Sequence, residues 1–226
     1  MRWNWQDPDW PNFRYRPTLL ADREGLFLRQ SGVVVGIVRH VPDEERLPLV
    51  IELISTEALK TSEIEGEMLD RDSIQSSLRR QFGLQGDSAR SAPAEQGIAE
   101  MLGDLYRHWA DPLDDATLFQ WHNWLLQGRT DLRTVGDYRK HPEPMRVVSG
   151  RIDFEAPSCS RVATEMTRFC HWFNATSAAG EAPLPALARA GLAHLYFECI
   201  HPFEDGNGRI GRAVAEKALA QGAGQP

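Results

Sequence analysis

Apolar residues recur at three- and four-residue spacing over much of the chain, a pattern typical of amphipathic helices. From Pro48 this spacing predicts a helix that runs to about Ile64 and stops at Gly66. A second helix is expected at roughly 70–82. The same pattern predicts further helices at about 94–109, 114–127, 159–174, 184–200 and 209–221. The sequence therefore indicates a mainly α protein.

Two segments have the composition of β-strands instead. Residues 26–38 contain a β-branched run beside Ser31-Gly32, which favours a short hairpin or a single strand pair. Residues 145–154 form two short alternating runs around Ser149-Gly150 and predict a β-hairpin. We therefore expect a helical body with little strand.

The chain divides into two expected parts. Its first 16 residues are rich in aromatic side chains but broken by Pro8 and Pro11, which predicts an arm packed on the body rather than a helix. Residues 83–93 are rich in Gly, Ser and Pro, as linkers are. We thus expect an N-terminal extension over 1–85 and a helical core over 94–226.

Composition narrows the function classes. The 226 residues are 42% hydrophobic, and Lys+Arg 25 against Asp+Glu 32 leave a net charge of −7. This is a globular composition, and its sign speaks against sequence-independent nucleic-acid binding. No apolar run is long enough to span a membrane, and the N-terminus lacks a secretory h-region. The 3 cysteines have no CxxC spacing, so we expect a cytoplasmic protein without disulfides.

The clearest chemical signal is a loop between two apolar helical runs. A Gly206-Asn207-Gly208 turn at a helix N-terminus offers free backbone N–H groups and the positive end of the helix dipole to an anion. Arg209 and Arg212 are three residues apart and project from one side of the first helical turn. Guanidinium groups bind phosphate oxygens through paired hydrogen bonds, so this pattern favours a polyphosphate site.

Two further residues of the loop suggest catalysis. His201 can take a proton from a hydroxyl near neutral pH, and the Asp205 carboxylate is a natural Mg²⁺ ligand beside phosphates. Taken singly, a histidine at a helix end is more often a cap, and paired arginines are usually solvated. The chain has no GxxxxGK[ST] motif and no HRD or DFG motif, which excludes P-loop NTPases and protein kinases.

The segment His201-Pro202-Phe203-Glu204-Asp205-Gly206-Asn207-Gly208-Arg209-Ile210-Gly211-Arg212 resembles the HPFx[D/E]GNGRxxR signature of Fic-domain proteins at every fixed position. The helical pattern from about residue 94 onward is also similar to that family. Most of its members transfer AMP from ATP to protein hydroxyls. The resemblance thus implies a Fic-type helical core and a protein adenylyltransferase that uses ATP and Mg²⁺.

The resemblance also implies a role for each motif residue. His201 would deprotonate a Ser, Thr or Tyr hydroxyl of a target protein, or of the chain itself, for attack on the α-phosphate. Asp205 would hold Mg²⁺, and the amides of Gly206, Asn207 and Gly208, with the Asn207 side chain, would stabilise charge there. Arg209 would contact the phosphate chain, and Arg212 would hold the γ-phosphate.

Phe203 within the motif and two segments before it extend the likeness. Phe203 would be a buried anchor, not a reactant. The hairpin at 145–154, with Val147, Val148 and Ile152, resembles the family's flap, which aligns a target segment by strand addition. Gly136-Asp137-Tyr138-Arg139 resembles the segment that precedes the flap.

A second motif suggests regulation. Thr61-Ser62-Glu63-Ile64-Glu65-Gly66 fits the inhibitory pattern [S/T]xxxE[G/N] of the Fic subgroup in which an inhibitory helix precedes the core. In that subgroup the glutamate, here Glu65, pairs with the second motif arginine, here Arg212, and leaves ATP bound unproductively. The charges of Glu63 and Glu67 are also consistent with a plain solvated helix end. Members with this extension often form homodimers.

The sequence leaves alternatives open. Glu65 could instead orient a water that removes AMP from a modified hydroxyl, and the donor could be another nucleotide. From a different class, the chain could be a non-catalytic nucleotide sensor, although intact His201 and Asp205 argue against it. The chain ends soon after the motif helix, whereas Fic proteins usually continue with helices around the adenine, so we expect a shortened core or a less enclosed site.

Overall fold

The computed structural model describes residues 2–84, 91–148 and 152–226. Within these ranges it contains eight α-helices, one short 3-10 helix and one two-stranded antiparallel sheet. The elements, in chain order, are η1 (Asn4–Gln6), α1 (Pro17–Arg39), α2 (Asp43–Ile64), α3 (Arg71–Gln81), α4 (Pro93–Arg107), α5 (Asp115–Leu125), β1 (Arg146–Val148), β2 (Ile152–Glu155), α6 (Cys159–Ala175), α7 (Ala186–Ile200) and α8 (Asn207–Ala223). The prediction of a mainly α fold with a small hairpin is confirmed.

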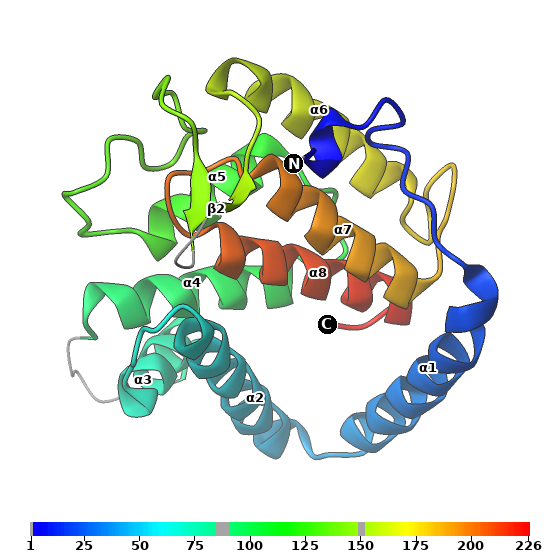
Figure 1. Cartoon of the computed structure of the whole chain (residues 1–226). Coiled ribbons are helices and arrows are strands. Elements are labelled where there is room, and N and C mark those ends of the chain that lie inside the picture. The colour runs from blue at the N-terminus through cyan, green and yellow to red at the C-terminus, as the bar shows by residue number, and fades with distance from the viewer. Residues whose placement is uncertain (1, 85–90, 149–151) are drawn as a thin grey trace.

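Helices α7 and α8 form the centre of the molecule. They lie side by side, and the other helices surround them (Figure 1). The side chains of Phe197 on α7 and Val214 on α8 are fully buried in one core that also takes Trp121 from α5 and Phe169 from α6. The loop that connects α7 to α8, residues 201–206, is the one that carries the phosphate-binding pattern. Its two ends are therefore fixed by the most enclosed pair of helices.

The prediction of a short hairpin or a single strand pair at 26–38 is wrong. These residues belong to α1, which begins with Pro17 at its first position and runs for 23 residues. The β-branched run lies on a helix that has no buried residue, and Val33, Val34 and Ile37 are each more than half exposed. Intrinsic β propensity depends strongly on context, and it does not decide the conformation of this segment. A hydrogen bond also connects α1 to α7, since the Glu24 carboxylate accepts from the backbone N–H of Leu187 in the first turn of α7 at 3.0 Å.

The helix expected from Pro48 is present and begins five residues earlier than predicted. Helix α2 starts at Asp43 and contains Pro48 inside it. Its end at Ile64 agrees with the prediction, and Gly66 follows in the left-handed conformation, with φ 79°. Helix α3 confirms the prediction for roughly 70–82, and Asp70 caps it by accepting a hydrogen bond from the Ser73 N–H. Together α2 and α3 place residues 61–67 against α8.

The other predicted helices are also confirmed within a few residues at each end, as α4, α5, α6, α7 and α8. The expected linker at 83–93 falls partly on residues 85–90, which lie outside the described residues. Cys159, Cys170 and Cys199 are free thiols. In the described part of the chain, every helix is too short or too polar to cross a lipid bilayer.

The hairpin predicted at 145–154 is present. Strands β1 and β2 pair antiparallel, with Arg146 opposite Glu155 and Val147 opposite Phe154. The backbones of Val148 and Ile152 pair next, after a shift in register, while the turn at 149–151 and the side chains of Val148 and Ile152 lie outside the description. Val147 is 43% exposed, so this strand has an apolar side chain facing solvent.

The N-terminal aromatic arm packs on the body, as predicted. The Trp10 ring meets the Tyr196 ring of α7 edge to face at 5.0 Å, and its indole N–H donates to the Glu165 carboxylate of α6 at 3.0 Å. Trp3 meets Phe154 of the hairpin in the same manner at 5.5 Å. The arm, which includes η1, thereby contacts α6, α7 and the hairpin.

Candidate active site

The loop between α7 and α8 begins with an unusual backbone conformation. His201, the C-cap of α7, has φ 51° and ψ 62°, the left-handed region that costs a non-glycine residue about 1–2 kcal/mol. The buried Arg139 guanidinium compensates, since it donates to the His201 carbonyl at 2.8 Å and to the Pro157 carbonyl at 2.6 Å. The backbone N–H of Arg139 also donates to the Pro202 carbonyl. The 136–139 segment therefore holds the loop in shape.

Phe203 anchors the middle of this loop. Its side chain is fully buried and stacks on the His122 imidazole of α5, with ring centroids 4.1 Å apart. The Asn207 side chain closes the loop on itself, because its oxygen accepts from the Phe203 N–H and its amide donates to the Phe203 carbonyl, both at 2.9 Å. Both polar atoms of the buried Asn207 side chain are thus hydrogen-bonded to the loop backbone, so this side chain holds the loop in place.

His122 is held as a neutral imidazole. Its Nδ1 accepts a hydrogen bond of 2.8 Å from the Gly136 N–H, so the proton is on Nε2, which faces the Asp205 carbonyl at 3.3 Å. Burial lowers the pKa of His122 to about 4, and the contact with the Asp205 carbonyl only partly opposes this effect. This residue shapes the loop from beneath and stays uncharged at neutral pH.

The His201 side chain is partly exposed, at 16%. Its Nδ1 is buried and lies 3.6 Å from a carboxylate oxygen of Glu198, one turn earlier on α7. This distance is too long for a hydrogen bond, and among the described residues Nδ1 has no hydrogen-bond partner.

Asp205 lies between a backbone amide and an arginine. One carboxylate oxygen accepts from the Gly206 N–H at 2.6 Å, and the other accepts from Arg129 at 2.9 Å. Asp131 holds the same guanidinium through two hydrogen bonds of 2.7 Å. The Asp131 contact is the main cause of a raised pKa for Arg129, and Arg129 lowers the pKa of Asp131 to about 2. Arg129 therefore stays charged next to Asp205.

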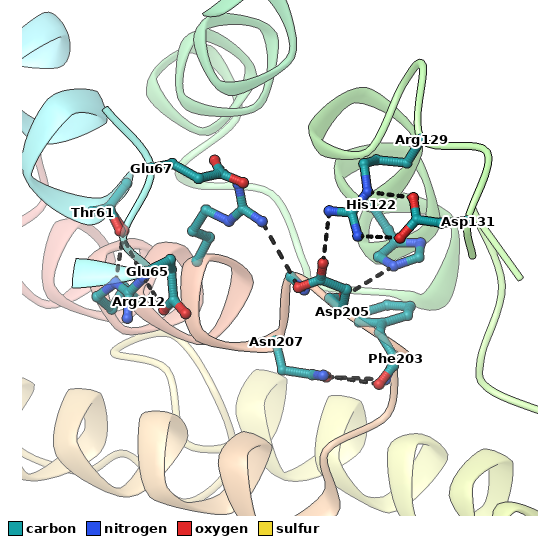
Figure 2. A network of polar contacts seen from close by, with 12 residues as sticks. Thr61, Glu65, Glu67, His122, Arg129, Asp131, Phe203, Asp205, Asn207 and Arg212 are labelled. Atoms are coloured by element: carbon teal, nitrogen blue, oxygen red, sulfur yellow. Dashed lines mark hydrogen bonds and ion pairs between the residues drawn. The ribbon is translucent and has the colours of Figure 1, made fainter. Parts of the chain in front are cut away.

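The two motif arginines both face the N-terminal segment. Figure 2 shows residues 61–67 on one side of the start of α8 and the residues of α5 and its following loop on the other. Arg212 donates through Nε to the Thr61 hydroxyl at 2.6 Å, and through Nη2 to the Thr61 carbonyl at 2.9 Å and to Glu65 at 2.7 Å. Arg209, which is 4% exposed, forms an ion pair of 2.5 Å with Glu67.

The glycines of the loop permit these close approaches. Gly206 caps α8 with φ 79°, a conformation that favours glycine. A Cβ on Gly208 would collide with the carboxylate of Glu65, so Glu65 reaches the helix N-terminus through the space that this glycine leaves. The amides of the first turn of α8 have no partner within the helix and can bind an anion.

The structure thus brings His201 and Asp205 of the loop together with Arg209 and Arg212 of the first turns of α8. Thr61, Glu65 and Gly66 lie beside them. In the described ranges, no group of three His, Cys, Asp or Glu side chains forms a ready-made metal cage. A single carboxylate such as Asp205 still fits Mg²⁺, which is often bound by one or two carboxylates together with substrate phosphates.

Several neighbouring residues were missed by the sequence analysis. Glu198 stands three residues before His201 on one helix, and that spacing was an available signal. His122, Arg129 and Asp131 come from α5 and the loop after it, and no short pattern links them to residue 205. The sequence was also consistent with Glu67 as a solvated charge at a helix end, and the structure places Glu67 in contact with Arg209.

Comparisons with known proteins agree with this geometry. Residues 112–219 match the Fic/DOC family, and residues 3–84 match a domain of unknown function, DUF4172. Among curated proteins, none matches the chain.

Similar solved structures are Fic proteins. A Fic family protein from Desulfovibrio desulfuricans G20 covers 93% of this chain and 59% of its own, with a TM-score of 0.60 and 22% identity. A Fic domain containing signaling protein from Bacteroides thetaiotaomicron VPI-5482 covers 86% and 73%, with a TM-score of 0.67 and 22% identity. A fragment of Fic-1 from C. elegans covers 90% and 59%, with a TM-score of 0.57 and 20% identity.

The chain therefore spans less than two thirds of the Desulfovibrio and C. elegans chains. At such low identity these likenesses establish the fold alone. The chain has the Fic fold, and its residues 112–219 match the Fic/DOC family.

Proposed function

We propose that the chain is an autoinhibited protein adenylyltransferase, which transfers AMP from ATP to a Ser, Thr or Tyr hydroxyl of a target protein or of itself. The observation that carries the proposal is the set of three hydrogen bonds from Arg212 to Thr61 and Glu65, beside a loop that presents His201 and Asp205. A phosphate-binding arginine is thus paired with an acid from a separate segment.

In the proposed reaction His201 is the general base. Its Nε2 takes the proton of the target hydroxyl, and the hydroxyl oxygen attacks the α-phosphorus of ATP. The bond from that phosphorus to the α–β bridging oxygen breaks, and pyrophosphate leaves. Glu198, 3.6 Å from Nδ1, stabilises the imidazolium that forms.

The phosphates would be bound by the start of α8. The amides of Asn207 and Gly208, Arg209 and Arg212 offer hydrogen-bond donors and positive charge. Asp205 would hold Mg²⁺. When bound, the metal neutralises phosphate charge and favours departure of pyrophosphate. Asp205 is already oriented for this role by the Gly206 N–H and by Arg129.

Inhibition is proposed to be local competition. Glu65 occupies Arg212, which would otherwise hold the γ-phosphate, and its carboxylate repels a phosphate placed there. This assignment puts the chain in the Fic subgroup with an N-terminal inhibitory helix. The exposed edge around Val147 is the proposed place where a target segment adds a strand.

Intact-mass spectrometry after incubation with ATP and Mg²⁺ tests the proposal. We expect the Glu65→Gly variant to gain one or more AMP adducts, while the wild type gains few or none. Glu63→Gly is a matched control, because Glu63 lies in the last turn of α2, two residues before Glu65, and its carboxylate pairs with the exposed Lys60. The double variant Glu65→Gly with His201→Ala should bind ATP and gain no adduct. Glu65→Gly without an adduct, despite bound ATP, would contradict autoinhibition by Glu65.

The same measurement separates the alternatives. If Glu65 instead positions water for removal of AMP, wild-type protein should strip the adduct from modified Glu65→Gly protein, which differs in mass from the wild type. If the chain is a non-catalytic nucleotide sensor, all variants should bind ATP and none should gain or lose AMP.

A further inference from the structure

A second carboxylate from the inhibitory segment lies on the other motif arginine. We propose that the ion pair with Glu67 keeps Arg209 from binding the phosphate chain of ATP. Residues 61–67 then block both motif arginines, and Glu65 and Glu67 have different effects on the nucleotide. Glu67 sets the affinity for ATP, whereas Glu65 controls where the γ-phosphate lies. This inference rests on the proposed function, because it concerns regulation of the same nucleotide site.

The Arg209 pair is a close and poorly hydrated contact. Arg209 is 4% exposed, and its Nη1 lies 2.5 Å from Glu67, while its Nη2 is 3.9 Å from Asp205. Charge-assisted hydrogen bonds strengthen as water is excluded, in contrast to exposed ion pairs. Glu67 therefore occupies the Nη1 donor that Arg209 would offer to a phosphate, whereas Nη2 has only a long ion-pair contact with Asp205.

The end of α2 fixes where Glu67 stands. The Glu67 N–H donates to the Ser62 carbonyl at 3.0 Å, and the Gly66 N–H donates to the Glu63 carbonyl at 3.0 Å. These two bonds, with Gly66 at φ 79°, are those of a Schellman C-cap. The chain reverses at Gly66 and delivers the next side chain to α8. The glycine of the inhibitory pattern, Gly66, thus allows the turn that directs the Glu67 side chain toward Arg209.

The two partners differ in their freedom to move. Glu67 is 35% exposed, so its carboxylate can turn into water, whereas Arg209 is enclosed at the start of α8. An incoming phosphate can therefore displace Glu67 without rebuilding the loop. Because the displaced pair must be broken first, ATP binds more weakly than it would to a free Arg209.

Glu63 supplies a matched comparison within the same turn. Its carboxylate pairs with Lys60 at 2.7 Å, and both side chains are more than half exposed. Replacing Glu63 removes the same charge from the same segment but frees neither motif arginine. General electrostatics would affect both positions alike, whereas the proposed contact affects Glu67 only.

Isothermal titration calorimetry with ATP and Mg²⁺ tests the inference on wild type, Glu67→Gln, Glu65→Gly and Glu63→Gln. We expect Glu67→Gln to bind ATP about tenfold more tightly than wild type, since one charge-assisted contact to Arg209 no longer competes. Glu63→Gln should bind like wild type. Thermal unfolding of each variant shows that the fold is retained.

The result of this titration can contradict the role of Glu67 without contradicting the proposed transferase, and the reverse also holds. Equal or weaker ATP binding by folded Glu67→Gln, or equal tightening in Glu63→Gln, would overturn the role of Glu67 even if Glu65→Gly gains AMP. Tighter binding by Glu67→Gln with no adduct on Glu65→Gly would support the contact and contradict the transferase.

Discussion

The His122 imidazole joins three parts of the candidate site through its ring atoms. It receives the Gly136 N–H, faces the Asp205 carbonyl and stacks on Phe203. A protonated imidazole could not accept from Gly136, and its charge would be buried among these groups. The loop geometry therefore depends on a neutral histidine.

This dependence predicts an acid response. The pKa of His122 is lowered to about 4 in the folded chain and is ordinary, near 6.5, when unfolded. A depressed pKa contributes stability above the unfolded value, and this contribution is lost as pH falls toward 4. NMR titration of the imidazole should show His122 neutral at pH 5.5. A midpoint near 6.5 would contradict the buried, hydrogen-bonded tautomer.

At this scale the sequence was informative where residues are close together in the chain. His201, Asp205, Arg209 and Arg212 lie in one short stretch whose helix spacing already predicts a shared site. Arg129 and His122 are more than 70 residues away from the loop along the chain. Their contacts depend on how α5 packs beneath α8, which no local pattern encodes.

Among the elements, helix ends decide the position of the regulatory residues. Periodicity predicted the end of α2 correctly, because Gly66 is a strong C-terminal signal. The same reasoning was wrong at residues 26–38, where α1 has a β-branched run and no buried residue. A helix with few buried side chains has a weak hydrophobic periodicity in its sequence. The prediction for these residues therefore followed their β propensity.

The C-cap at Gly66 can be tested by substitution. A Cβ there would meet nothing within 4 Å, so only the backbone conformation opposes a side chain. Gly66→Ala should therefore cost about 1 kcal/mol and lower Tm by about 2–4 °C, while Gly66→Asn should cost less, since asparagine tolerates positive φ. Thermal unfolding by circular dichroism measures both, and an alanine variant as stable as wild type would contradict the left-handed turn.

For the whole molecule, the N-terminal residues pack on the helical core that has the Fic fold. The aromatic arm contacts α6, α7 and the hairpin, while α2 supplies Thr61 and Glu65 to the start of α8. The aromatic content of the first 16 residues predicted the packing of the arm. It could not predict which surface the arm covers, because that surface is assembled from residues more than 140 positions away.

Trp10 tests whether the arm and the domain unfold together. Its ring contacts Phe13 and Tyr196, and its N–H donates to one oxygen of the buried Glu165 carboxylate. Trp10→Ala removes this apolar contact and this hydrogen bond, while Arg161 still pairs with the other carboxylate oxygen. We expect a loss of about 2 kcal/mol and a Tm lower by about 4–8 °C in one cooperative transition. Leu19→Ala is the control, because Leu19 is 68% exposed on α1 and should change Tm little. If Trp10→Ala instead melts only a minor early transition, the arm is an independent appendage and its contacts do not support the site.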